Sequence, residues 1–187
     1  PACDDLNSLL DPALHVAGSG QPIRFAPAVA APPQGYEAHI HDSGAVPTRE
    51  GNGHDLFNAF AWLAFPAGKC ALNQLHRRHA GDDPPGRRSP ARDVLTLFDE
   101  SGVIVVCADA ELVALLTGFR WKELFWSQRD RVRRSMRFVV IGHALQEQAL
   151  APHPGITGKA LICPAAPDDI GGLDTWLAAQ ITRPQIL

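Results

Sequence analysis

Proline and glycine set the strongest limits on how this chain can fold. The 187 residues contain sixteen of each, and the prolines crowd residues 1–35 and 81–90. Because proline lacks an amide donor and blocks helix interiors, neither segment is expected to hold a long helix. Residues 54–65 and 127–150 contain no proline and a single glycine, Gly142. These two stretches are therefore expected to form a regular scaffold around which the Pro-rich segments wrap.

Length and composition indicate one globular domain. Domains usually hold about 100–200 residues, so 187 residues suit a single one. With 45% hydrophobic and 20% charged residues the chain can bury a core. No apolar run approaches the ~18–20 residues of a membrane-spanning helix. We expect a soluble α+β domain in which several helices pack on a small, mainly antiparallel sheet, with residues 1–35 as its wrapping segment and 36–187 as its core.

Periodicity and turn signals predict the individual elements. β-branched and aromatic residues favour strands, whereas apolar residues spaced three and four apart favour helices. Asp109 is expected to cap a helix that stops at Gly118. On this basis we predict strands at 36–41 and 159–163, a hairpin of 92–98 with 103–107, and helices at 54–65, 67–80, 110–117, 121–126, 127–150 and 173–181.

The stretch 54–65 has an unusual polar side. Asn52 is the expected N-cap, with Asp55 three residues later, and Pro66 ends the helix. At 100° per residue, one face is apolar and another carries several polar groups. The apolar face holds Leu56, Phe60, Leu63 and Ala64, and the other holds His54, Asp55, Asn58 and Trp62.

The stretch 127–150 places two titratable groups together. On one continuous helix, His143 and Glu147 share the core-facing stripe. A buried carboxylate needs a partner, because burying it unpaired costs several kcal/mol. An i, i+4 His and Glu can bind a metal ion or hold the imidazole as an oriented base. A purely structural His–Glu hydrogen bond explains the spacing equally well.

A second polar cluster lies where a loop enters the helix at 54–65. It comprises Arg49, Asn52, His54, Asp55 and Asn58. A helix N-terminus offers free amides and a positive dipole, and an arginine adds a bidentate donor, so an anionic group would be stabilised there. The histidine can act as acid, base or metal ligand. Alternatively, the same residues serve only as caps and exposed turn residues.

Other polar patterns are weaker. His39 with His41, and His76 with His79, have spacings that arise by chance in a chain with eight histidines. Asp99 is expected in the hairpin turn, although it and Arg92 would flank a site if the hairpin packed beside His54. The chain lacks GxSxG, GxxxxGK[ST], HExxH and GxGxxG before a helix, so common hydrolase, P-loop and dinucleotide-binding functions are unsupported.

Charge and cysteine content bear on partners and location. The formal net charge of −3 provides no global field for nucleic acid or an anionic membrane. Residues 120–137 nevertheless carry a surplus of five positive charges, typical of either a solvated helix or a phosphate-binding surface. Four scattered cysteines without a CxxC motif indicate free thiols and a reducing cytoplasm. Residues 1–10 contain no targeting signal. The basic residues are Arg120, Lys122, Arg129, Arg131, Arg133, Arg134 and Arg137, and the cysteines are Cys3, Cys70, Cys107 and Cys163.

Four segments resemble one uncharacterised bacterial family, domain of unknown function 3025. They are VPTREGNGHDLFNAFAWLAFP (46–66), RDVLTLFDESG (92–102), FRWKELFW (119–126) and GHALQEQ (142–148). The resemblance covers about residues 36–160 and implies a bacterial, cytoplasmic protein, with no established activity or catalytic residues to carry over. In the family pattern an aromatic residue usually occupies the position of Gly53, and a lysine that of Gln148.

These observations lead to one working hypothesis. His54 and Asp55 meet His143 and Glu147 in a partly buried polar cleft that Arg49 and Asn58 also line. His54, His143 and Glu147 would bind a divalent metal ion, zinc or another, and Arg49 would stabilise negative charge. The protein would then be a metal-assisted hydrolase or phosphoesterase acting on a small or phosphate-containing ligand.

Two alternatives remain open. In the first, the protein is a noncatalytic binding or adaptor protein in which His143 and Glu147 form an internal lock and the Arg-rich segment or residues 121–126 contact a partner. In the second, residues 129–137 bind nucleic acid. Direct ligation of one metal requires bonds of about 2 Å, so histidines more than roughly 10 Å apart would contradict the hypothesis.

Overall fold

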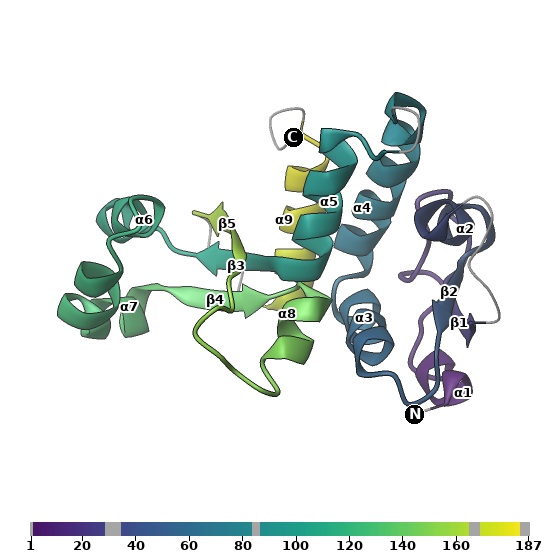
Figure 1. Cartoon of the computed structure of the whole chain (residues 1–187), viewed down its shortest axis with the longest axis horizontal. Helices are drawn as coiled ribbons and strands as arrows, with labels where there is room; N and C mark the ends of the chain where they lie inside the picture. Colours follow the sequence, from purple (N-terminus) through teal and green to yellow (C-terminus); the bar gives the residue numbers. More distant parts are fainter. Residues whose placement is uncertain (1, 29–34, 84–86, 165–168, 184–187) are drawn as a thin grey trace.

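The computed structural model is an α+β structure (Figure 1) and describes residues 2–28, 35–83, 87–164 and 169–183. Its strands are β1 (Arg24–Pro27), β2 (Ala45–Thr48), β3 (Gly102–Val106), β4 (Arg137–Val140) and β5 (Lys159–Cys163). Its helices are α1 (Cys3–Asn7), α2 (Tyr36–Ser43), α3 (Gly53–Ala64), α4 (Pro66–Arg78), α5 (Pro90–Ser101), α6 (Ala110–Thr117), α7 (Arg129–Ser135), α8 (His143–Gln148) and α9 (Ile170–Ile181), with a 3-10 turn η1 (His79–Asp82) and a π-helical turn η2 (Glu123–Ser127).

The strands form two small sheets. β1 pairs in parallel with β2. In the other sheet β3 is central, antiparallel to β4 and parallel to β5. The expectation of a mainly antiparallel sheet is therefore wrong, because two of these three pairings are parallel. The second strand of each parallel pair is reached through connecting segments far longer than a hairpin turn.

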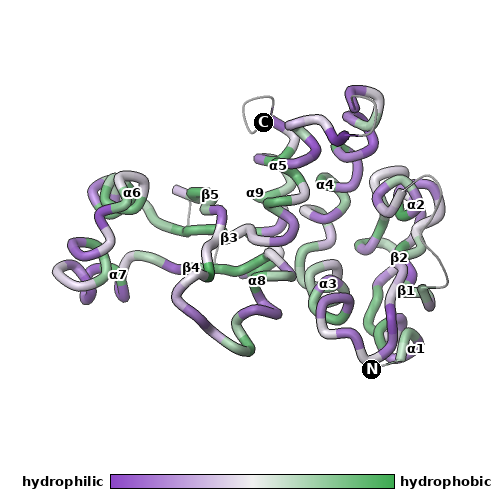
Figure 2. The backbone as a smooth tube through the Cα atoms, viewed as in Figure 1, coloured by the Kyte–Doolittle hydropathy of each residue, from purple (hydrophilic) through white to green (hydrophobic). Residues whose placement is uncertain are grey.

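Three apolar clusters hold these elements together. The first packs α4, α5 and α9 against β3, around Leu72, Ile104 and Leu177. The second surrounds Trp62 of α3 with side chains from α1, β1 and β2. The third lies under α6, η2 and α7 at the far end of β3. Figure 2 shows the corresponding hydrophobic runs along β3 and β4, and the long helices α4, α5 and α9 stand beside them.

Several predicted elements are confirmed. Asn52 caps α3 by accepting a hydrogen bond from the Asp55 amide, and Asp109 caps α6 by accepting from two backbone amides. Helix α4, strand β5 and helix α9 also lie within a few residues of their predicted bounds. Local capping signals and proline positions are sufficient to place these elements.

The predicted strand at 36–41 is wrong, since these residues belong to α2. Glycines with positive φ flank this helix: Gly35 at +88° before it and Gly44 at +67° as its C-cap. Such angles suit glycine, and the left-handed Gly44 ends the helix at the turn expected there. Ile40 is the buried residue of α2.

The predicted hairpin is also wrong in its first half. Residues 90–101 form α5, and only Gly102–Val106 is a strand. Pro90 occupies the first turn, where it favours a helix. Leu95 and Phe98, three residues apart, pack into the first apolar cluster, and this helical spacing overrides the β-branched content of the segment.

The predicted helix at 127–150 is divided into three elements. α7 ends at Ser135, β4 pairs with β3 over Arg137–Val140, and α8 begins at His143. The run Phe138 to Ile141 is aromatic and β-branched, and pairing with a buried strand stabilises it as a strand.

The faces of α3 differ from those predicted. Trp62 is 1% exposed and Asn58 is buried, whereas Phe60 is 42% exposed. The side that carries polar groups therefore faces inward, toward α8 and the second apolar cluster. This inward polar side is what places α3 at the site.

Candidate functional site

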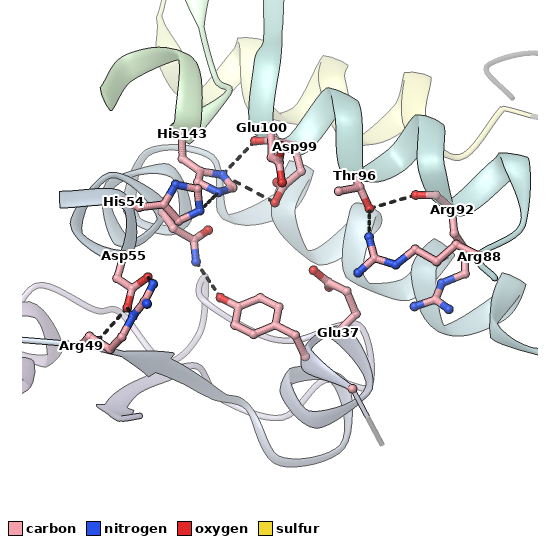
Figure 3. Close-up of a pocket in the computed structure, with 13 residues that line it drawn as sticks. Glu37, Arg49, His54, Asp55, Arg88, Arg92, Thr96, Asp99, Glu100 and His143 are labelled. Carbon is pink, nitrogen blue, oxygen red and sulfur yellow. Dashed lines mark hydrogen bonds and ion pairs between the residues drawn. The ribbon is translucent and has the colours of Figure 1, made fainter. Parts of the chain in front are cut away.

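A cavity of about 580 Å³ opens where α2, α3, α5 and α8 meet (Figure 3). Its wall combines two histidines with charged and hydroxyl groups, so several titratable side chains converge on one cavity, as in candidate active sites. The lining residues are Gly35, Tyr36, Glu37, Arg49, His54, Asp55, Asn58, Arg88, Arg92, Thr96, Asp99, Glu100 and His143.

Two imidazoles meet at the inner wall of this cavity. The Nε2 atoms of His54 and His143 are 3.1 Å apart, and the rings cross at 71°. His54 is about one-third exposed, whereas His143 is buried. The two residues are 89 positions apart in the chain, so the contact is a product of the tertiary fold.

The opposite nitrogen of each ring contacts an oxygen. Nδ1 of His143 lies 2.9 Å from the main-chain carbonyl of Asp99, and Nδ1 of His54 lies 3.2 Å from Oε2 of Glu147. A carbonyl and an ionised carboxylate are acceptors only, so each Nδ1 donates its proton. This assignment follows from the hydrogen-bond partners.

Burial distinguishes the two rings. His143 is the buried ring, and burial favours its neutral form. With its Nδ1 proton donated to the Asp99 carbonyl, its Nε2 is left as an acceptor that faces Nε2 of His54. His54 is the more exposed ring and pairs with Glu147.

Local structure positions each histidine. His54 occupies the first turn of α3, immediately after the cap made by Asn52. His143 begins α8 directly after Gly142. A Cβ at Gly142 would lie within 2.6 Å of backbone atoms of residues 100–102, so the backbone of Gly142 rests directly on the end of α5. Glycine, which has no Cβ, permits this approach.

Beneath the histidines lies a buried ion pair. Nζ of Lys69 is 2.6 and 2.8 Å from the two carboxylate oxygens of Asp99. The same ammonium donates to Oδ1 of Asn58 at 3.0 Å, and Asn58 Nδ2 donates to the Tyr36 hydroxyl at 2.8 Å. A continuous hydrogen-bonded chain thus connects α2, α3, α4 and α5.

Burial and charge shift the pKa values of this network. Burial lowers the pKa of His143 to about 4, with Asp99 opposing the shift and Lys69 adding to it. Burial alone would raise the pKa of Asp99, but Lys69 and then His143 outweigh it and hold that pKa below its usual value. Burial, reinforced by Glu37, raises the pKa of Tyr36, so its hydroxyl stays protonated at neutral pH.

Arg49 and Asp55 form a separate pair at the cavity mouth. The guanidinium donates from Nε and Nη2 to the two Asp55 oxygens at 2.8 and 2.9 Å, and the Arg49 amide donates to the same carboxylate. Burial alone would raise the pKa of Asp55, but the hydrogen bonds and charge of Arg49 outweigh it and hold that pKa below its usual value. Arg49 therefore lines the site as predicted but is already neutralised there.

Glu147 contacts His54, as the working hypothesis requires. It is about two-fifths exposed, so its predicted place on a core-facing stripe is wrong. The alternative of a His143–Glu147 hydrogen bond is also wrong, because the two ring nitrogens of His143 meet the Asp99 carbonyl and His54. A Cβ at Gly53 would lie 3.3 Å from Glu147 Oε1, so glycine leaves room for this carboxylate.

The geometry bears on the predicted metal ligands. His143 meets His54 at Nε2, whereas Glu147 meets it at Nδ1, on the other side of the ring. The three side chains therefore do not converge on one point. Within the described ranges, no group of three or more His, Cys, Asp or Glu side chains is arranged to hold a metal ion. Any ion at the pair would have two histidine ligands and further positions for water or substrate.

Part of the cavity wall is not predicted from the sequence, namely Tyr36, Glu37, Arg88 and Thr96. Lys69, which lies beneath the histidines, is not predicted either, and Glu100 is expected only in the hairpin turn beside Asp99. Arg92 and Asp99 line the cavity from a helix, not from the predicted hairpin. The spacing of Arg92, Thr96, Asp99 and Glu100, at i, i+4, i+7 and i+8, is the signal that would have revealed one polar helix face.

The weaker histidine candidates do not line the cavity, although His76 lies beside Lys69 and Asp99. His41 contacts Asp42, and His79 contacts Asp82. His76 is buried, and its Nδ1 finds no hydrogen-bond partner among the described residues. All four cysteines are free, as expected, and Cys107 and Cys163 are buried. In the part of the chain that the structure covers, no helix is both long and apolar enough to cross a membrane.

The comparison with known families agrees with the resemblance noted in the sequence. A family model described as protein of unknown function (DUF3025) matches residues 23–186. The chain belongs to this family. The match begins earlier and ends later than residues 36–160, so DUF3025 includes β1 and α9. No curated protein and no solved structure gave a significant match.

Proposed function

We propose that this DUF3025 protein is a hydrolase of phosphodiesters in which His54 and His143 act as an acid–base pair. The observation that carries the proposal is the 3.1 Å contact between the two Nε2 atoms, each ring being oriented through its Nδ1. Paired titratable groups whose surroundings favour different protonation states are typical of general acid–base sites. In this proposal the buried His143 is the base and the more exposed His54 is the acid.

The two rings would share the proton transfers of hydrolysis. His143 takes a proton from water as the water oxygen bonds to phosphorus. His54 donates its Nε2 proton to the leaving oxygen as the phosphorus–oxygen bond breaks. His143 then holds a proton that its low pKa disfavours, and the proton returns to His54 across the short contact. Water and ester are consumed, and the pair ends as it began.

One cation in the cavity, Arg88, supports a substrate with a single negative charge. Asp55 is neutralised by Arg49 and Asp99 by Lys69, and Arg92 pairs with Asp83. Arg88 also lines the cavity, bonds to the Thr96 hydroxyl and has no carboxylate partner in the described ranges. Glu37 and Glu100 add negative charge, which disfavours a dianion. A phosphodiester carries one negative charge and therefore fits better than a phosphomonoester.

Hydrolysis of chromogenic esters tests this proposal. We expect the purified chain to hydrolyse bis(p-nitrophenyl) phosphate faster than p-nitrophenyl phosphate. Since general acid–base catalysis contributes about 10²–10⁴-fold, His54→Gln and His143→Gln should each lower the rate by that order. His153→Gln, an exposed histidine outside the cavity, serves as the matched control.

Two results would contradict the proposal. One is the absence of hydrolysis with all ester probes by a folded chain. The other is equal activity in the two cavity variants and in the control. Loss of stability in His143→Gln without any hydrolysis by the parent chain would favour the noncatalytic binding or adaptor function instead.

A second candidate, metal-assisted hydrolysis, is favoured by one specific feature. Histidines that bind metals usually donate their other ring nitrogen to a carboxylate or carbonyl, as both histidines do here. Two nitrogens bound tetrahedrally at about 2.0–2.1 Å lie roughly 3.3 Å apart, close to the 3.1 Å between the Nε2 atoms. A divalent ion would then replace the shared proton, and both Nδ1 partners would keep their roles.

A further inference from the structure

The lobe formed by α6, η2 and α7 carries a row of exposed aromatic rings. In Figure 1 this lobe projects from the long helices, at the far end of β3 and β4. Phe119 and Trp126 are 73% and 71% exposed, and Trp121, Phe125 and Phe138 are between 41% and 48% exposed. Contiguous apolar surface of this kind usually marks a binding site. We call these five residues the aromatic row.

Four of the rings contact one another in sequence. The Phe119 and Trp121 centroids are 5.4 Å apart, Trp121 and Phe125 are stacked at 6.1 Å, and Phe125 and Phe138 are 6.1 Å apart. The rings therefore form a continuous surface from the start of η2 to the edge strand β4, and Trp126 adds a further exposed indole.

The aromatic row does not belong to the core of the lobe. Leu124 is fully buried below it and packs with Leu112 and Val132. The π-helical turn and the positive φ of Phe119, +55°, hold the rings outward. A bulky residue in the left-handed region is strained, and such strain concentrates at functional sites.

Positive charge surrounds the aromatic row. Residues 119–138 contain seven Lys and Arg against Glu123 and Asp130, a surplus of five in a chain of net charge −3. Asp109 and Glu111 neutralise Arg131, and Glu123 pairs with Arg120. Lys122, Arg133 and Arg134 have no carboxylate partner in the described part of the chain. The partner is therefore expected to be anionic, which disfavours a second copy of this lobe.

We propose that the aromatic row and its cations bind single-stranded nucleic acid. Bases stack on exposed aromatic rings, and Lys and Arg contact the phosphates, which together give sequence-tolerant binding. Every exposed large hydrophobic residue within 119–138 is aromatic, and the aliphatic Leu124 lies buried. A membrane-inserting surface would also present Leu or Ile, and here the rings alternate with charged residues. This site is independent of the cavity at His54 and His143.

Fluorescence anisotropy with the full chain tests this site. Labelled oligo(dT) and oligo(U) of about twenty nucleotides exceed the ~4–16 nucleotides that compact single-strand sites cover. Binding should quench tryptophan fluorescence. Removing a stacking ring in Trp126→Ala or Phe119→Ala should weaken binding at least about fivefold. The exposed Leu150→Ala, with a side chain 73% exposed outside the lobe, is the matched control.

Salt dependence tests the charge contribution. Each phosphate contact on a single strand adds about −0.7 to the slope of log K against log salt, so three free cations predict a slope of about −2. Arg133→Ala/Arg134→Ala should reduce the slope by about 1.4. The control Arg24→Ala/Arg183→Ala removes two exposed arginines elsewhere and should leave it unchanged.

The binding results distinguish RNA, DNA and an anionic membrane as partners of the lobe. A preference for oligo(U) over oligo(dT), or the reverse, identifies RNA or DNA as the ligand and supports the site in either case. Absence of binding to both oligonucleotides, or equal binding by the ring variants, overturns the proposal. Binding only to vesicles containing phosphatidylglycerol, with a blue shift of tryptophan emission, would also overturn it and would assign the lobe to an anionic membrane.

Discussion

Lys69 and Asp99 form a salt bridge in which both side chains are almost entirely buried, at 5% and 13% exposure. Asp99 also supplies the main-chain carbonyl that receives the Nδ1 proton of His143. One residue of α5 therefore neutralises a buried cation and orients the buried imidazole. The ion pair and the histidine pair are structurally coupled through this single position.

Breaking this ion pair should be costly. Lys69→Met or Asp99→Leu leaves one buried charge unpaired, and such changes typically cost about 3–5 kcal/mol. The double variant Lys69→Met/Asp99→Leu should lose clearly less than the sum of the two. Urea unfolding of the four proteins measures this coupling. Glu123→Gln, which breaks the exposed pair with Arg120, should cause no measurable change, and additive losses at Lys69 and Asp99 would contradict the coupling.

The stability of the fold should fall as pH decreases from about 6.5 to about 4. The pKa of His143 is near 4 in the folded protein and about 6.5 in an unfolded chain, so the unfolded state binds the extra proton across this interval. The shift corresponds to about 3 kcal/mol of folding stability. This stability is present above about pH 6.5 and is lost progressively below it.

Urea midpoints at several pH values measure this loss. Asp99 and Asp55 also have lowered pKa values. Their contribution to stability is present above pH ~3.8 and is lost below it, which is mostly at lower pH than the loss caused by His143. His143→Gln should flatten the dependence between pH 6.5 and 4. An unchanged slope in that variant would rule out His143 as its source. The exposed His153→Gln should retain the parent slope.

Replacing Gly142 by alanine should disturb the site through the backbone. The new Cβ would lie 2.5 Å from the Glu100 carbonyl and from the Gly102 amide nitrogen, so α8 or α5 must move. Overpacking of this kind costs about 1–3 kcal/mol. The displacement should move His143 and reduce any hydrolysis at least tenfold. Gly81→Ala, whose Cβ would meet nothing within 4 Å, should match the parent protein.

Metal removal separates the two forms of the proposed hydrolase. If His54 and His143 bind a divalent ion, elemental analysis of the purified chain should find it, and dialysis against a chelator should abolish activity that zinc restores. Binding should be lost in His54→Gln and His143→Gln but retained in His153→Gln. Activity that persists unchanged after complete chelation would support the proton-sharing pair and contradict metal assistance.

Local sequence signals predict the helix ends correctly where neighbouring residues alone determine them. The caps Asn52 and Asp109 and the prolines at 66 and 90 each mark a helix end or start. Yet Pro90 begins α5, where the sequence predicts the end of a Pro-rich segment followed by a strand. The β-branched residues of that segment favour a strand, whereas the spacing of Leu95 and Phe98 favours a helix. Only the packing of α5 on α4 shows which signal prevails.

Pairing between distant segments cannot be predicted from local sequence signals. No signal near residues 137–140 identifies β3 as their partner, and without that partner the segment is predicted as part of a helix. The contact between His54 and His143 was expected, and the structure brings them together at 3.1 Å. Glu147 also meets His54 as expected, but it is about two-fifths exposed where a core-facing stripe of a longer helix predicts burial. The wall formed by α5 was largely missed for the related reason that its helical face went unrecognised.

Strand register determines where His143 lies relative to His54. β4 pairs Val140 with Val103, and the next amides, of Ile141 and Gly142, both bond to the Gly102 carbonyl before His143 begins its helix. A slip of one residue would shift β4 by about 3.3 Å, comparable to the whole Nε2–Nε2 separation. The ladder between β3 and β4 therefore fixes the distance from His143 to His54, although neither strand supplies a side chain to the cavity wall.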